Sequence, residues 1–130
     1  MVPVMRYLSL LLLLLTVVNR PSPIAAPPAP GDVIVNEYAS DNDAKENDFF
    51  ELLVLKDVVD LRGLRVTDNE LIKGVLNNGE SVFVFGDDAF LAAVPRGTLI
   101  AVWTSTAGVT TDTSVNPSAG DWNLVLAPGT

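Results

Sequence analysis

Acidic and amide side chains crowd one segment of the chain, Asp41-Asn42-Asp43-Ala44-Lys45-Glu46-Asn47-Asp48. Their oxygens would suit calcium, a hard cation that takes about six to eight oxygen ligands. The alternation of Asp41 and Asp43 is typical of the start of a calcium loop, but the glycine of the sharp turn and a bidentate Glu at the required distance are missing. We interpret this segment as a solvated loop between two strands, with calcium as the alternative, and assign no metal site.

Catalytic side chains are scarce. The chain has no histidine, so the serines and threonines lack the commonest activating base. Glu37 and Glu51 could lie on neighbouring strands as a glycosidase pair, but a domain this small offers little room for a substrate cleft. Asp87 and Asp88 could bind a metal, although a turn or helix cap is the simpler interpretation. We therefore predict no enzyme, no catalytic residue and no cofactor, and keep a small hydrolase as an alternative.

Charge narrows the class of partner. Two of the eight basic residues precede Gly31 and all 16 acidic residues follow it, so the later part has a formal charge of −10. This charge disfavours nucleic acid and anionic lipid surfaces and favours cationic partners or divalent ions. With no cysteine, the domain must depend on its hydrophobic core alone. Trp103 and Trp122 are expected in that core; an exposed tryptophan would instead favour a carbohydrate-binding module.

The first 30 residues have the layout of a secretory signal. A short segment ending at Arg6 is followed by an uncharged run over Tyr7–Val18 and a Pro/Ala-rich stretch to Pro30. The run is shorter than the roughly 20 apolar residues of a membrane span. We predict a signal peptide over 1–26, cleaved near Ala25 or Ala26, a Pro/Ala spacer over 27–30 and a secreted or extracytoplasmic domain over 31–130. An uncleaved anchor and a buried helix are the alternatives.

From Gly31 onward, short β-rich runs separated by turn residues predict an all-β sandwich or small barrel. Gly63 is expected at a bulge. Asn78-Gly79 predicts a hairpin between two apolar runs. A helical turn is expected over Asp88–Val94, capped by Asp87 or Asp88, and a long surface loop over 107–120. The expected strands cover 33–38, 49–55, 61–67, 71–76, 81–85, 98–104 and 122–126.

Read in order, these segments resemble the lamin-tail domain family in its exported bacterial form. The matching stretches are Asp32-Val33-Ile34-Val35-Asn36-Glu37, Phe49-Phe50-Glu51-Leu52, Val59-Asp60-Leu61-Arg62-Gly63-Leu64-Arg65-Val66-Thr67-Asp68 and the turn and strand over 77–85. Two departures stand out: the apolar run continues after Leu52 where the family has a polar turn, and Leu64 replaces an aromatic residue. The resemblance implies an immunoglobulin-like sandwich, which the signal helix expected from the N-terminal layout would precede. It also implies a non-enzymatic binding or scaffold role at the cell exterior, with a protein or cell-surface partner of unknown identity.

Within the matching stretches, we expect Asp60, Gly63 and Asp68 to be structural, with Asp60 bonded to a nearby turn amide. The chain ends soon after the apolar run at Leu126, and the resemblance implies a further strand. A sandwich that lacks its last strand would have an unpaired edge. Three alternatives are left open: the strand count is wrong, the chain is a truncated gene copy, or another chain supplies the strand.

Overall fold

The computed structural model describes residues 25–40, 48–76, 82–104 and 108–127. The predicted signal segment up to Ile24, residues 41–47 of the acidic segment and the Asn78-Gly79 turn lie outside the described residues. Among the residues that are described, no helix is long and apolar enough to cross a membrane.

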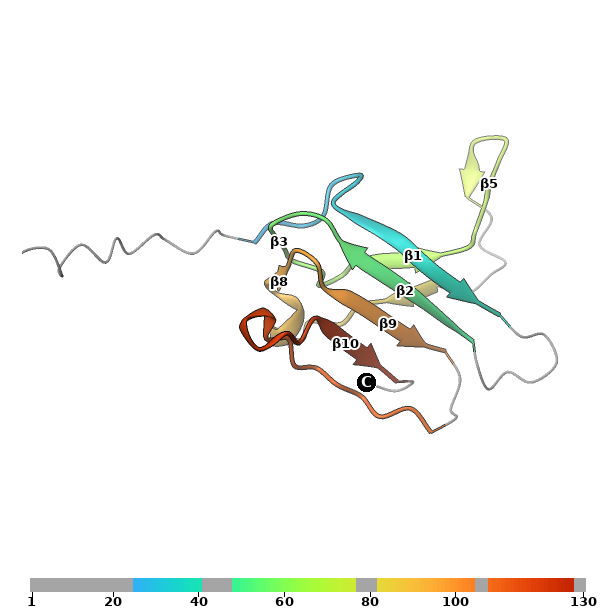
Figure 1. The fold of residues 1–130 in the computed structure, drawn as a ribbon. Helices are drawn as coiled ribbons and strands as arrows, with labels where there is room; N and C mark the ends of the chain where they lie inside the picture. The colour runs from blue at the N-terminus through green and yellow to red at the C-terminus, as the bar shows by residue number, and fades with distance from the viewer. Residues whose placement is uncertain (1–24, 41–47, 77–81, 105–107, 128–130) are drawn as a thin grey trace, which may run out of the picture.

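The largest element is a four-stranded sheet (Figure 1). Its strands are β1 (Val33–Ala39), β2 (Phe49–Val54), β9 (Leu99–Trp103) and β10 (Asn123–Leu126), in the order β1-β2-β9-β10. The pairs β1–β2 and β2–β9 are antiparallel, whereas β10 runs parallel to β9. The parallel pair requires a long connection, which the chain makes through residues 104–122.

One face of this sheet, the inner face, carries the core. Burial alternates along β2, β9 and β10, as the two-residue period of a strand requires. The aliphatic and aromatic residues of the inner face therefore leave water and drive folding. They are Phe50, Leu52, Val54, Ile100, Val102, Leu124 and Leu126.

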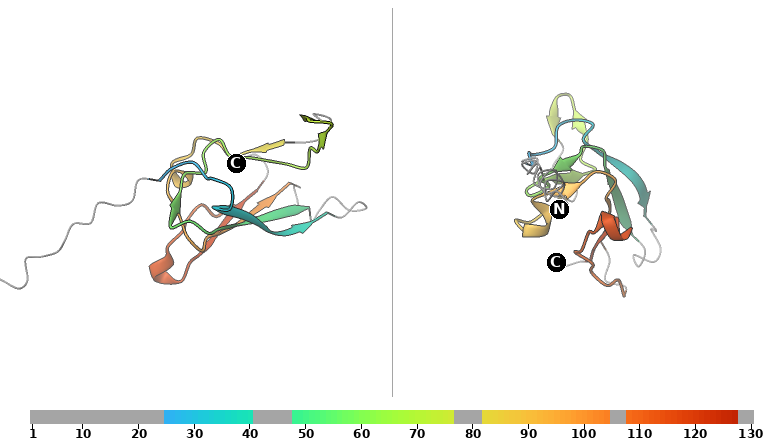
Figure 2. Two further views of the ribbon diagram at one scale, coloured as in Figure 1. Left: turned by 90° about the horizontal axis from the view of Figure 1, so that it is seen from above. Right: turned by 60° about the vertical axis from the view of Figure 1, so that its left-hand side comes forward.

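A second layer of small two-stranded sheets lies over the inner face (Figure 2, left). One pairs β4 (Arg65–Thr67) with β7 (Val82–Val84), and another pairs β3 (Val58–Val59) with β8 (Val94–Pro95). This layer supplies Val59, Leu61, Phe85, Leu91 and Val94 to the core. The described part of the chain is thus mostly strand with almost no helix, and the predicted all-β class is confirmed.

The third expected strand is shorter than predicted. Leu61 starts a turn that its carbonyl closes with the Leu64 amide at 3.0 Å, and only Arg65–Thr67 pair as a strand. Gly63 lies in that turn with φ of +74°, so the prediction of a bulge there was wrong. The sheet's bulge lies instead in β1, between Val35 and Glu37.

The segment 71–76 is a hairpin and not the single strand that was expected. β5 (Leu71–Ile72) and β6 (Val75–Leu76) pair across a turn made by Lys73 and Gly74, whose φ angles are 51° and 80°. Two consecutive positive φ angles match the right-handed twist of a hairpin. Lys73 lacks the glycine or asparagine signature of such turns, which is why the sequence pointed to Asn78-Gly79 instead. The hairpin projects from the body of the domain (Figure 1).

The expected helical turn forms as a short 3₁₀ helix, η2 (Ala89–Leu91). Asp88 occupies its N-cap position but makes no side-chain capping bond. The long loop contains a second one, η3 (Pro117–Ala119).

The outer edge of β10 is not left bare. Asp112 and Val125 exchange two backbone hydrogen bonds of 2.8 Å each, so the chain's own loop pairs with this edge.

Candidate functional site

The four-stranded sheet has a second face that the described layers do not cover, here called the outer face. Cross-strand register arranges it in three rows, because residues paired across a sheet point to the same side. Most of its side chains are apolar and half-buried, although an antiparallel sheet exposed on one side normally presents polar residues there. The rows are Ile34, Leu53, Leu99 and Asn123; Glu37, Glu51, Ala101 and Val125; and Ala39, Phe49 and Trp103.

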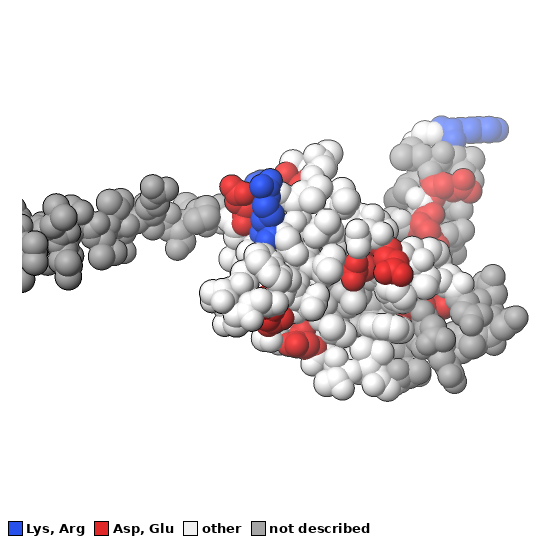
Figure 3. Space-filling model, in the orientation of Figure 1, with Lys and Arg blue, Asp and Glu red and all other residues white. Residues whose placement is uncertain are grey.

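Charge on this face is confined to the middle row. Figure 3 shows the molecule from the side of the four-stranded sheet: the surface is largely uncharged, with small groups of acidic side chains, and basic side chains lie only toward the upper edge of the view. Glu37 and Glu51 are the charged members of the rows, and they pair directly across β1 and β2. The two carboxylates thus lie on neighbouring strands, the placement that the glycosidase alternative would need.

The bulge in β1 creates this juxtaposition. Val35 pairs with Leu52 on the inner side, and the extra residue Asn36 then shifts the register so that Glu37 faces Glu51. The Asn36 side-chain amide donates to Oε1 of Glu51 at 2.6 Å. Within the described ranges, the ion pairs involve neither glutamate. Because like charges directly opposite each other destabilise a sheet, this arrangement costs stability in the free protein.

The aromatic row holds a stacked pair. The rings of Phe49 and Trp103 lie 4.9 Å apart between centroids, with 30° between their planes. Trp103 is half-buried on the outer face because Val102 takes the inward position of β9, so its prediction as a core residue was wrong. Trp122 is also outside the core: it is 39% exposed, and one edge of its indole ring lies against Gly97.

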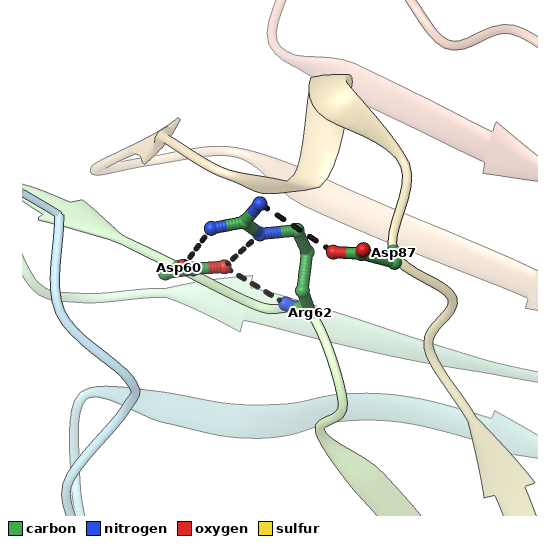
Figure 4. A network of polar contacts seen from close by, with 3 residues as sticks. All are labelled: Asp60, Arg62 and Asp87. Carbon is green, nitrogen blue, oxygen red and sulfur yellow. Dashed lines mark hydrogen bonds and ion pairs between the residues drawn. The ribbon is translucent and has the colours of Figure 1, made fainter.

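The Asp60 carboxylate, by contrast, belongs to a structural network (Figure 4). It accepts from the Arg62 amide at 3.1 Å and from the Arg62 guanidinium at 2.7 and 2.9 Å, and Arg62 reaches Asp87 at 3.4 Å. The side-chain bond from Arg62, followed by the amide bond, holds the pKa of Asp60 below its usual range. The expected bond from Asp60 to a turn amide is therefore present, and it fixes the turn that contains Gly63.

Asp48, the last residue of the acidic segment, lines a cavity of about 310 Å³. Asp68, Tyr38, Phe50 and Phe83 share this lining. Across the described ranges, no group of three or more potential ligands is placed to hold a metal ion. The calcium alternative thus depends on residues outside the described ranges.

Comparison with protein families, curated proteins and solved structures finds no match to this chain. The resemblance to lamin-tail domains therefore stays a prediction.

The outer face was not predicted as a site, although the sequence holds its signal. Leu53 and Leu99 continue apolar runs through positions that alternation would make polar. The continuation past Leu52 was interpreted only as a departure from the family pattern.

Proposed function

We propose that this chain is an exported, non-enzymatic binding or scaffold module of lamin-tail type, with an immunoglobulin-like sandwich, that contacts a partner at the cell exterior. Three features support the proposal: the ordered motifs between Asp32 and Phe85, the signal-like N-terminal segment, and the two stacked layers of strands. The partner binds on the outer face of the four-stranded sheet.

The observation that carries the proposal is the apolar character of the outer face. Soluble proteins rarely expose contiguous apolar surface without a use for it. Leu53, Leu99 and Val125 are only half-buried there, while alternate residues of the same strands already fill the core. Adding a partner would remove this surface from water at about 25 cal/mol per Å².

Binding to the envelope of producing cells tests the proposal. The purified protein is labelled and incubated with intact cells, and retention is compared with that of a Leu53→Arg variant. Val75→Arg is the matched control, because Val75 is an exposed apolar residue on the β5–β6 hairpin. We expect retention to fall for Leu53→Arg alone. Equal retention of all three proteins would overturn the assignment to the outer face.

A hydrolase is the rival class. Phosphodiester, ester and glycoside substrates are assayed with the purified protein, and we expect no turnover. Turnover that disappears in Glu37→Gln or Glu51→Gln variants would make the glutamate pair catalytic and overturn the proposal.

Export is tested separately. Cell fractionation with N-terminal sequencing is expected to find the protein outside the cytoplasm, beginning near Ala26. A cytoplasmic protein that retains its first residues would contradict this part of the proposal.

A further inference from the structure

The glutamate pair combines two adjacent charges with largely apolar surroundings. Two other carboxylates of the domain have close basic partners: Asp32 pairs with Lys56 at 3.1 Å and Asp60 with Arg62 at 2.7 Å. Glu37 and Glu51 instead lie side by side in an apolar face, with a bond from Asn36 to one of the four carboxylate oxygens.

A partner that covers this face would remove both carboxylates from water and must therefore compensate their charges. Burying an unpaired carboxylate is strongly unfavourable, because the ion loses its hydration and gains no partner. A neutral partner, including a neutral sugar, would leave that cost in place. A cation placed between the two carboxylates would offset it and would also relieve their mutual repulsion.

The surrounding rows specify the rest of the partner. Leu53 and Leu99 are apolar neighbours in the row on one side of the glutamates, which ends in Asn123 at β10, and the stacked Phe49–Trp103 pair lies in the row on the other side. The two stacked rings each cover part of the other, which leaves less free ring surface for a sugar to stack on. Apolar side chains fit on both sides of a central cation.

We propose that the outer face binds a protein segment that presents an arginine or lysine between apolar side chains, with the basic group between Glu37 and Glu51. Arginine fits best, because its planar fork of donors matches carboxylates and is weakly hydrated. The Asn36 amide acts as a positioning group that holds the Glu51 carboxylate in place. This inference rests on the proposed function and names the chemistry of its partner.

Selection from a phage-displayed library of random dodecapeptides on the purified protein tests the inference. We expect enriched peptides to carry arginine or lysine flanked by apolar residues. The Glu37→Gln/Glu51→Gln variant should bind a selected peptide about tenfold more weakly or worse, as for loss of a close charge pair. A peptide with citrulline in place of arginine should lose affinity for the native protein by a similar factor.

A second variant keeps the net charge change matched. Asp57→Asn/Glu70→Gln removes two exposed carboxylates that lie outside the rows of the outer face, and it should bind the peptide as the native protein does. Thermal unfolding of both variants checks that they are folded. If both double variants weaken peptide binding equally, the effect comes from the net charge alone, and the inference is overturned.

The remaining outcomes separate this inference from the function it rests on. Peptides without a basic residue whose binding Leu53→Arg abolishes would overturn the inference and leave the binding face standing. Binding of a neutral glycan that Phe49→Ala abolishes would do the same. If no enriched peptide and no glycan is sensitive to Leu53→Arg, the inference and the outer-face assignment both fail.

Discussion

Thr98 lies just before β9, and its polar side chain is buried in the core. Its hydroxyl donates to the Pro95 carbonyl at 2.8 Å and so joins β8 to the start of β9. Thr98→Val keeps the shape but removes the donor, and we expect a loss of about 1 kcal/mol in the free energy of unfolding, measured with urea. Thr98→Ser keeps the hydroxyl. It should therefore recover most of the stability that Thr98→Val loses with the hydrogen bond. A Thr98→Val variant as stable as the native protein would show that this bond contributes nothing.

The carboxylate of Asp60 gives the stability a defined pH dependence. Its pKa is lowered in the folded state by Arg62, so its contribution is complete above the unfolded pKa of 3.8 and disappears as the pH falls through the folded value. Asp60→Asn should therefore lower the melting temperature at neutral pH, and the difference from the native protein should vanish in strong acid. Melting curves between neutral pH and strong acid measure it. A constant difference at all pH values would contradict the ion-pair explanation.

The hydrogen bond of Asp60 could be predicted from the sequence, whereas that of Thr98 could not. The bond from Asp60 to a turn amide follows from the local Asp-Leu-Arg-Gly order and was predicted correctly. The Thr98 bond spans a turn between two elements whose boundaries the sequence does not fix. The surroundings of Trp103 and Trp122 depend on which set of alternate residues in each strand faces inward. Apolar residues occupy both sets, so the sequence pattern does not show which set is buried.

At the scale of elements, the junction of β9 and β10 depends on a close approach between Gly97 and Trp122. Gly97 has a φ of +88°, and a Cβ there would lie 3.2 Å from the Trp122 ring. The Trp122 carbonyl accepts from the Leu99 amide at 2.8 Å, so the same contact sets the register of the parallel pair.

A pair of glycine substitutions separates backbone strain from this contact. Gly63 has a φ of +74° but open space around its Cβ position, so Gly63→Ala should cost about 1 kcal/mol from strain alone. Gly97→Ala should cost about 1 kcal/mol more, because it also displaces the Trp122 ring. When unfolding by urea is measured in a Trp122→Ala background, Gly63→Ala and Gly97→Ala should lower the free energy of unfolding by the same amount. Equal costs in the native background would contradict the role assigned to Trp122.

The strands themselves were predictable where they are long. β1, β2 and β9 lie where β-branched and aromatic runs indicated them, because packing reinforces their local propensity. The short strands β3 and β8 could not be predicted, since each pairs two residues brought together from distant parts of the chain. The Lys73-Gly74 turn was missed because Lys73 adopts a conformation that its residue type rarely shows.

For the whole molecule, the core formed by the two layers must supply the stability, because the chain has no cysteine to cross-link it. The same strands that fill this core also present the outer face. The proposed function therefore depends on one structural claim: in each strand, the residues of the inner face stabilise the fold, and the alternate residues of the outer face can contact a partner.

Adjacent leucines of β2 test that claim most directly. Leu52 is 3% exposed on the inner face, whereas Leu53 is half-buried on the outer face. Urea unfolding of the full chain should show that Leu52→Gln loses about 3 kcal/mol or more, through a cavity and a buried amide. Leu53→Gln should lose no more than about 1 kcal/mol, as is usual for a partly exposed position. If Leu53→Gln destabilises the protein as much as Leu52→Gln, another part of the chain covers the outer face, and the account of it as a binding surface is wrong.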